Sequence, residues 1–454
     1  MAHSTVTATE GHALSVGQEA LWFLHALAPE SSAYNTSAAV ELDFDVDVAA
    51  LRTAVLAVVA ENSMLNCLVR TTPSGPRRLP GAAAPYPSVF EVLPAGGDDG
   101  ALHATALAAS RRPFRLDREP PVRVSLLLRE QGGALLVVTA HHIAVDNPSQ
   151  GRLCRDLLAA YGRVVAGAAP VGAGADRGAP YAEFVGRERD FLQSPRGTSA
   201  ARYWRDVLEA VPHDPPLAGD LPRPEVYRFA GDQVERPVPA GLVDRVQALA
   251  ADANTTPFAV LLAGFQLLLY ALSGEPDRLI GYPASLRSGR VSRTATGHYV
   301  NTLPLAARVE ADDGFAGLLR RTADALRSGL VHRAYPFALM PRLVDRPRSA
   351  DRAGLIGLLF VVAVEDDGAP PGAGLPPGHA VRARPLPQQQ GQFDLTVQLS
   401  HRGTETVLVL RYNTSLLSAA AARTLADGYL GLLTAAVDGA LPERLGDLAS
   451  TLRL

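Results

Sequence analysis

The sequence predicts an α/β protein built of two lobes of similar size, and three observations lead to this fold class. Its 454 residues are too many for one ordinary hydrophobic core and suggest two domains of roughly 200 residues each. Helical and strand patterns mix in both halves of the chain, without a fixed repeat. A stretch rich in proline, glycine and alanine, at residues 166–180, has the composition of a linker.

We place the first lobe at residues 1–175 and the second lobe at residues 176–454. Inside the second lobe, residues 366–387 form another stretch rich in proline and glycine. Because such a composition is typical of a loop, we expect a latch or crossing loop near residues 365–392.

Each element is predicted from the spacing of its apolar residues. Helical spacing predicts helices at residues 14–27, 48–61, 149–165, 243–252, 258–272, 314–328 and 419–437. Short apolar or alternating runs predict strands at residues 38–44, 122–128, 134–140, 279–282, 303–309, 355–364, 393–399 and 406–412. The helix at 258–272 also has a start signal in Thr255-Thr256-Pro257 and a stop signal in Gly274.

The charged residues exclude several classes of function. The net charge is −3 and no long block of basic residues occurs, so the sequence lacks the electrostatic pattern of a nucleic-acid-binding protein. All 43 basic residues are arginine. Without lysine, the chain can form no lysine Schiff base and no P-loop of the usual kind.

Cysteine use and apolar runs indicate a cytoplasmic protein. Cys67 and Cys154 are the only cysteines and form no CxxC pair, so neither a disulfide framework nor a metal site is predicted. The first residues lack the basic and apolar parts of a signal peptide. The longest apolar stretch, 258–272, is interrupted by Gln266 and is shorter than a membrane span.

The segment that carries chemistry lies between a buried strand and a helix. The apolar run 134–139 leads directly into His141 and His142, and Asp146-Asn147-Pro148 follows. Asn147 is the expected N-cap of the next helix, with Pro148 at its first position. Because adjacent side chains of a strand point to opposite faces, one imidazole can face a cleft while the other faces the interior.

Two interpretations of the histidine pair stay open from residue chemistry alone. A histidine with a pKa near neutrality can take a proton from a nucleophile, whereas a pair of buried histidines can also be purely structural. The chain has no Gly-x-Ser-x-Gly and no His-Glu-x-x-His motif, and Cys154 falls among leucines of a predicted core helix. If the protein transfers an acyl group, we expect a histidine to act as base without a covalent enzyme intermediate.

The segment HHIAVDNPS resembles the His-His-x-x-x-Asp-Gly motif of nonribosomal peptide synthetase condensation domains and of chloramphenicol acetyltransferase-like enzymes. The resemblance continues in order along the chain, in LSVGQEALWFLHALAPESSAYN, YAEFVGRERDFLQ, AARYW, IGYPASLRSGR, GHYVNTLPL, HRAYPFALM, GLLFVVAVED, QFDLTVQL and RYNTSLL. It implies two chloramphenicol acetyltransferase-like lobes arranged as a V, with a tunnel between them. It also implies no permanently bound cofactor, since the phosphopantetheine arm of a carrier protein brings the substrate.

The resemblance implies roles for individual residues. His142 would be the cleft-facing general base or the group that positions the acceptor, and His141 would be structural. Asp146 would pair with Arg287 and hold the turn. Residues expected in the tunnel are Tyr282, Ser285, Tyr299 and Asn301.

Two positions depart from the family pattern. Asn147 stands where family members usually carry glycine, and a side chain there could crowd the tunnel or contact a substrate. The family's Arg-His-Glu-x-Leu-Arg-Thr motif appears as residues 61–67, Glu-Asn-Ser-Met-Leu-Asn-Cys, without either arginine. The histidines, Asp146 and Arg287 are nevertheless present, and we expect a specialised but working enzyme.

These features together predict a free-standing condensation enzyme, because no adenylation domain or carrier-protein motif follows the predicted last helix. It would be an acyltransferase of natural-product or antibiotic biosynthesis. It would move an aminoacyl or peptidyl group from a peptidyl carrier protein, supplied in trans, to an amine or alcohol, forming an amide or ester. Two alternatives remain: a catalytically inactive condensation-like module that recruits a tailoring enzyme, and an acyltransferase that uses acyl-coenzyme A.

Overall fold

The computed structural model describes residues 11–81, 87–94, 98–130, 132–170, 176–211, 214–346, 349–352, 354–363, 375, 378–387, 391–402 and 405–454. The chain forms two compact units, each built from segments that are not contiguous in sequence. Unit 1 comprises Met1–Phe191, Arg287–Val300 and Asp366–Gln389. Unit 2 comprises Leu192–Leu286, Asn301–Glu365 and Gln390–Leu454.

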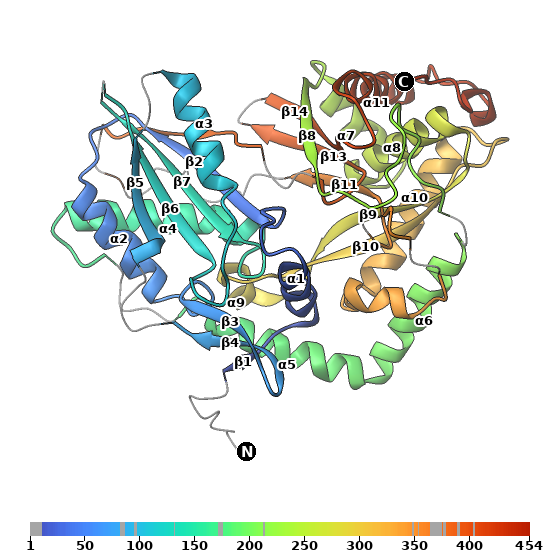
Figure 1. Ribbon diagram of the computed structural model, residues 1–454. Helices are drawn as coiled ribbons and strands as arrows, with labels where there is room; N and C mark the ends of the chain where they lie inside the picture. The colour runs from blue at the N-terminus through green and yellow to red at the C-terminus, as the bar shows by residue number, and fades with distance from the viewer. Residues whose placement is uncertain are drawn as a thin grey trace. The chain divides into compact units, whose positions relative to one another are not determined.

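The main sheet of unit 1 has five strands in the order β12-β2-β7-β6-β5 (Figure 1). Only β5 and β6 run parallel; the other neighbours are antiparallel. A second, antiparallel sheet has the order β1-β4-β3. The strands are β1 (His12–Ala13), β2 (Asn35–Leu42), β3 (Cys67–Thr72), β4 (Gly75–Pro80), β5 (Phe90–Pro94), β6 (Val122–Leu128), β7 (Ala134–His141) and β12 (Val381–Arg384).

Helices cover both faces of the five-stranded sheet. Helices α2 (Val48–Ala60) and α4 (Asn147–Val165) pack on one face, and α3 (Asp99–Ser110) packs on the other (Figure 1). Strand β7 is therefore buried on both sides, with Leu136 and Val138 in one core and Leu135 and Val137 in the other. This burial explains why β7 appears in the sequence as a continuous apolar run.

Three further helices belong to unit 1. Helix α1 (Val16–Leu27) begins with a capping box, in which Ser15 and Gln18 bind each other's backbone N–H groups. Helix α5 (Ala179–Gln193) is tied to this start, since Tyr181 Oη lies 2.9 Å from Ser15 Oγ and Val16 N donates to Glu188. The short α9 (Gly289–Thr294) lies in the second segment of the unit.

Unit 2 has one six-stranded sheet, in the order β10-β9-β11-β13-β14-β8 (Figure 1). β9, β11 and β13 run parallel, whereas β13, β14 and β8 are antiparallel. The strands are β8 (Gly231–Pro237), β9 (Asp277–Ser285), β10 (Val300–Arg308), β11 (Leu358–Ala363), β13 (Leu395–Arg402) and β14 (Glu405–Asn413).

The core of unit 2 forms around α8 (Pro257–Ser273), which is buried over residues 259–271. Thr256 caps its start and Gly274, with a φ of 72°, ends it, as the sequence predicts. Helices α7 (Leu242–Asp252), α10 (Phe315–Val331) and α11 (Ala419–Val437) all contact α8. Helix α6 (Pro195–Glu209) completes the main helices described in this unit.

The structure agrees with most predicted elements and contains others that the sequence patterns did not indicate. The ranges of β6 and α11 are the predicted ones, and the other predicted helices agree to within three residues at each end. The α-helices and strands that were not predicted are α3, α5, α6, α9, β1, β3, β4, β5, β8 and β12.

The predicted boundary between lobes, after residue 175, differs from the division seen in the structure. Residues 176–191 belong to unit 1 because α5 is bonded to the start of α1, and the segment 287–300 returns to unit 1. The predicted crossing loop near 365–392 supplies β12, which pairs with β2 at the edge of the unit 1 sheet. Residues 364–374, 376–377 and 388–390 of that loop lie outside the described residues.

Among the described helices, none alone has both the length and the apolar character to cross a membrane. The V arrangement of the lobes and the tunnel stay predictions.

Candidate active site

The histidine segment lies at the turn from β7 into α4. His141 is the last residue of β7, and Asp146 is the N-cap of α4, with its Oδ1 accepting a hydrogen bond from Ser149 N at 3.0 Å. The prediction of Asn147 as N-cap is therefore wrong by one residue. The Asp146 carboxylate reaches the N–H of Ser149, the third helical residue, whereas Asn147 is the first helical residue and is exposed.

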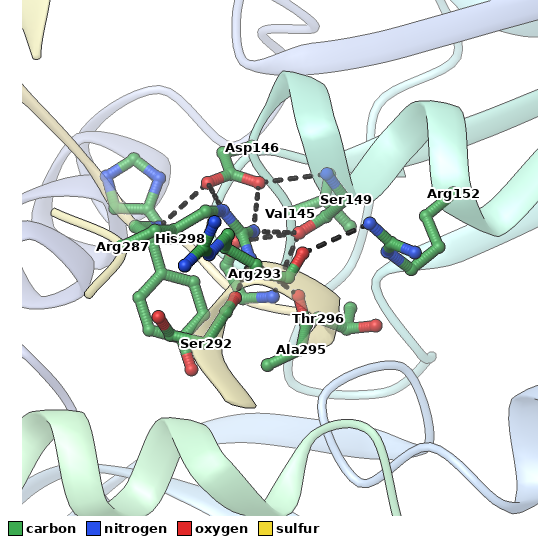
Figure 2. A network of polar contacts seen from close by, with 12 residues as sticks. Val145, Asp146, Ser149, Arg152, Arg287, Ser292, Arg293, Ala295, Thr296 and His298 are labelled. Atoms are coloured by element: carbon green, nitrogen blue, oxygen red, sulfur yellow. Dashed lines mark hydrogen bonds and ion pairs between the residues drawn. The ribbon is translucent and has the colours of Figure 1, made fainter. Parts of the chain in front are cut away.

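Asp146 forms a buried ion pair with Arg287, as the family resemblance implies (Figure 2). Nη2 donates to Oδ1 at 2.6 Å and Nε donates to Oδ2 at 3.2 Å. The other guanidinium N–H groups donate to Ser149 Oγ and to the carbonyls of Ser292 and Ala295. All five N–H groups of Arg287 are thus used, which is the condition under which a buried ion pair is stable.

His141 is enclosed in unit 1. Its Nδ1 accepts a hydrogen bond from Ile143 N at 3.1 Å, and the rings of His25, Tyr34 and Phe114 surround it. Burial, reinforced by His25 and other histidines, holds its pKa well below 6.5. A neutral, enclosed ring with a backbone hydrogen bond suits a structural residue.

His142 differs from His141 in that the residue as a whole is partly exposed. Its Nδ1 lies 2.6 Å from the carbonyl oxygen of Val145. A carbonyl only accepts hydrogen bonds, so Nδ1 carries the proton and Nε2 carries a lone pair. Burial lowers the pKa of His142, against the opposing effects of the Val145 carbonyl and Asp146. At neutral pH the ring is therefore mainly in the form that can accept a proton.

A second imidazole, which the sequence analysis did not select, lies against His142. His298 Nδ1 is 3.3 Å from His142 Nδ1, and the two rings are nearly perpendicular, at 84° with centroids 4.9 Å apart. His298 occurs in the quoted segment GHYVNTLPL, but it is 156 residues from His142 in sequence. A single histidine at that separation gives no sequence signal of proximity.

Two other polar residues hold this region in place. Gln18, buried in α1, donates from Nε2 to Ile143 O at 2.8 Å and so fixes the turn after β7. Ser149 Oγ is 3.1 Å from both the N and the O of Gly297 and anchors the residue before His298. The Ser-x-x-Gln spacing of the α1 capping box could have located Gln18 on a helix, but not its contact with Ile143.

The altered motif at residues 61–67 also supports the His298 segment. Asn62 is buried, and its Nδ2 donates to Thr296 Oγ1 at 2.8 Å. Its Oδ1 accepts from Met64 N at 3.1 Å. Thr296 lies two residues before His298, so this segment keeps a structural contact although both arginines of the family motif are absent.

Of the four residues expected in the tunnel, three are buried within their own unit. Tyr299 is buried in unit 1, with its ring 4.5 Å from the Arg287 guanidinium carbon. In unit 2, Tyr282 is buried, and Asn301 uses both amide N–H groups on the carbonyls of Arg333 and Tyr335. Ser285 is exposed at the end of β9. Three of the four therefore serve the packing of their own unit, and a role in a substrate tunnel stays a prediction for all four.

Comparison with protein families matches residues 9–444 to the condensation domain. The phosphinothricin tripeptide synthetase PhsC of Streptomyces viridochromogenes is 32% identical over 413 residues, 89% of this chain and 37% of that protein. The isonitrile lipopeptide synthase of Mycobacterium tuberculosis is 30% identical over 446 residues, 95% of this chain and 17% of that protein. The chain thus spans only a minor part of these relatives.

Solved structures share the fold over nearly the whole chain. The X-domain from teicoplanin biosynthesis has a TM-score of 0.85 at 24% identity, covering 100% of both chains. The X-domain in its complex with OxyB has a TM-score of 0.84 at 24% identity, covering 99% of this chain and 98% of that chain. The first condensation domain of the calcium-dependent antibiotic synthetase, in complex with a substrate analogue, has a TM-score of 0.78 at 21% identity, covering 97% of this chain and 99% of that chain. These likenesses confirm the predicted α/β fold with chloramphenicol acetyltransferase-like lobes.

Proposed function

The chain belongs to the condensation-domain family, and on that premise we propose that it transfers an aminoacyl or peptidyl group from a carrier protein to an amine or an alcohol. The group would leave the phosphopantetheine thioester of the carrier, and the product would be an amide or an ester. The observation that carries this proposal is the hydrogen bond from His142 Nδ1 to Val145 O, which leaves the Nε2 lone pair available.

In the proposed reaction the acceptor nitrogen or oxygen attacks the thioester carbonyl carbon. The new bond forms as the carbonyl π electrons move onto oxygen, and the C–S bond breaks as they return. The proton of the acceptor passes to His142 Nε2 and from there to the phosphopantetheine sulfur, so a free thiol is released. An alcohol acceptor depends more on this base, because at neutral pH it is a weaker nucleophile than an amine.

Asp146 and Arg287 have a positioning role in this proposal. The carboxylate of Asp146 is fully used by Arg287, Ser149 N and Tyr299 N, and no hydrogen bond joins it to the His142 ring in the described residues. The pair therefore fixes the turn on which His142 lies, and it does not form a relay with the imidazole.

Product mass spectrometry tests the proposal. The protein is mixed with a carrier protein loaded with a panel of aminoacyl and peptidyl groups, together with a panel of small amines and alcohols. We expect product from the parent protein and a loss of about 10²-fold or more in rate for His142→Ala. His103→Ala is the matched control, since His103 lies on α3 and has no part in the turn. Equal rates for the His142→Ala variant and the parent would overturn the assignment of His142.

A second candidate function is recruitment of a partner enzyme without catalysis. The likeness to the X-domain, which was solved in complex with OxyB, favours it. The two functions differ in outcome: a recruitment module binds an oxidase in a pull-down and turns over no loaded carrier. Presenting one acyl group both on a carrier and on coenzyme A, side by side, distinguishes carrier-dependent transfer from an acyl-coenzyme A transferase.

A further inference from the structure

Arg78 carries a buried positive charge that forms no ion pair with any carboxylate in the part of the chain that the structure describes. It lies on β4, and only 3% of the residue is exposed. Its hydrogen bonds within the described residues all come from Nη1, which donates to Ser63 O at 2.7 Å and lies 3.5 Å from Ser63 Oγ. A buried charge is normally paired, because leaving it without a counter-charge costs free energy.

The Arg78 side chain forms part of the wall of a pocket of about 270 Å³ in unit 1. The wall comes from β1, the end of α2, the segment 61–67, the end of β4 and the residue stretch before α5. Among the described residues, none of the turn between β7 and α4 lines it. Drug-sized ligands occupy pockets of about 300–1,000 Å³, so this pocket suits a smaller molecule.

The altered motif at residues 61–67 explains why Arg78 lacks a counter-charge on this side. Ser63 stands at the third position of the segment, where the motif of the family has its glutamate. The distance of 3.5 Å between Arg78 Nη1 and Ser63 Oγ is longer than an ordinary hydrogen bond. The serine therefore places a neutral hydroxyl beside the guanidinium, in the position that a carboxylate-bearing residue has in the motif.

Negative charges also border the pocket, since Glu61 and Asp176 belong to its wall. Asp176 is fixed there, because its Oδ1 accepts from Ser63 N at 2.8 Å and from a second backbone N–H at 2.7 Å. Burial and then Arg78 lower the pKa of His12, another wall residue, while Asp176 opposes this shift. Charges of both signs thus lie around one cavity. This combination disfavours a phosphate ion and favours a ligand that carries both charges.

We propose that this pocket binds the zwitterion of a small apolar α-amino acid. Its carboxylate would pair with the Arg78 guanidinium, whose planar N–H groups match a carboxylate. Its ammonium group would lie toward Asp176 and Glu61, and its side chain toward the apolar part of the wall at Leu79 and Pro80. The pocket is separate from the histidine turn, so this binding goes beyond the acyl transfer proposed above and does not depend on it.

Isothermal titration calorimetry of the full chain with L-alanine tests the proposal at neutral pH. Propionate and ethylamine are the comparison ligands, because each keeps one of the two charged groups of alanine. We expect saturable binding of L-alanine with a Kd of about 1 mM or less. Each comparison ligand should bind at least about tenfold more weakly, since it loses one charged contact.

Two substitutions examine the role of the guanidinium. Arg78→Gln removes its charge, and Ser63→Glu places a carboxylate beside it, so that Arg78 is paired within the chain. We expect both variants to bind L-alanine at least about tenfold more weakly than the parent. Ser63→Glu should keep the melting temperature of the parent, so it decides the question even if Arg78→Gln fails to fold. Arg77→Gln is the matched control and should bind like the parent, because adjacent side chains of β4 point to opposite faces.

Four outcomes overturn the proposal. The first is the absence of saturable L-alanine binding to the parent. The second is binding of propionate or inorganic phosphate as tight as that of L-alanine, which would make the pocket a simple anion site. The third is equal binding by the parent and a folded Ser63→Glu variant.

The fourth is loss of binding in His142→Ala, which would place the ligand at the histidine turn instead. We expect this variant to bind L-alanine like the parent. Since no carrier protein or acyl group is present in the titration, its result is independent of whether the protein transfers an acyl group.

Discussion

Helices α4 and α8 start in the same way but differ in what lies around the start. Asp146 caps α4 and Thr256 caps α8, each by accepting a hydrogen bond from the N–H of the third helical residue, and each helix has a proline in its first two positions. Around α4, the cap also binds Arg287, which is 141 residues away, and two histidines lie nearby. Around α8, the Thr256 hydroxyl forms one side-chain hydrogen bond within the described part of the chain, and it is local, from Ala259 N. The comparison shows that similar local chemistry becomes part of a buried polar site only where distant polar residues meet it.

The largest effect is expected at the ion pair of α4. Arg287→Ala leaves the Asp146 carboxylate buried without its partner, so we expect a loss of about 3–5 kcal/mol in the free energy of unfolding. Urea denaturation measures this loss. Arg290→Ala, at an exposed arginine of the same segment, is the control and should change stability by less than about 0.5 kcal/mol. A small loss in the free energy of unfolding for Arg287→Ala would show that the ion pair adds little stability to the start of α4, which would then resemble the start of α8.

The response to pH also distinguishes the start of α4 from the start of α8, because the imidazoles of His142 and His298, whose pKa values are lowered, lie beside the start of α4. In the unfolded chain His298 takes up a proton near pH 6.5, whereas in the folded chain its pKa is about 3. The unfolded state therefore binds more protons below pH 6.5, and stability is complete above this pH and falls as the pH decreases. Between pH 7.5 and 5.5 His298 alone should lower the free energy of unfolding by about 1.4 kcal/mol.

Urea denaturation of the parent and of His298→Gln at both pH values checks this expectation. The glutamine variant should lose less stability on acidification than the parent does. An identical decrease in both proteins would mean that His298 is protonated equally in the folded and unfolded states.

A smaller effect is expected at the cap of α8. Thr256→Ala removes the acceptor for Ala259 N and should lower the free energy of unfolding by about 1 kcal/mol, while Thr256→Ser should be nearly neutral. Thermal denaturation compares the two variants. Since no residue of the proposed site contacts this cap within the described residues, turnover per folded molecule should be unchanged. A loss of turnover per folded molecule in Thr256→Ala would show that the cap of α8 also affects the proposed site, which would contradict the difference between α4 and α8.

The smallest effect is expected at Asn147, where the family usually has glycine. Its side chain is exposed and lies outside the hydrogen bonds of Asp146. Asn147→Gly should therefore change the free energy of unfolding by less than about 1 kcal/mol and leave the rate of product formation within about threefold. A large change in KM for the acceptor would show instead that the side chain contacts substrate.

The sequence was most informative where a pattern is local and strong. The apolar period of α8 and α11, together with the start and stop signals of α8, predicted their ranges closely, because every residue of these helices contributes to the pattern. Strand β4 was not predicted, since Gly-Pro-Arg-Arg-Leu-Pro has no strand pattern of its own and is extended by pairing with β3 and β1. Helix α3 was missed because it is rich in alanine and has few large apolar residues.

By itself the sequence determined the α/β character, the strand that leads into the histidine pair and the helix that follows, since these depend on residues close together in the chain. Only the tertiary structure decided that Asp146 is the cap, that Gln18 holds the turn, and that His298 lies against His142. These contacts join residues that are three to more than one hundred positions apart, and side-chain direction and burial select them. No periodicity in the sequence indicates which of the 11 histidines will lie against each other.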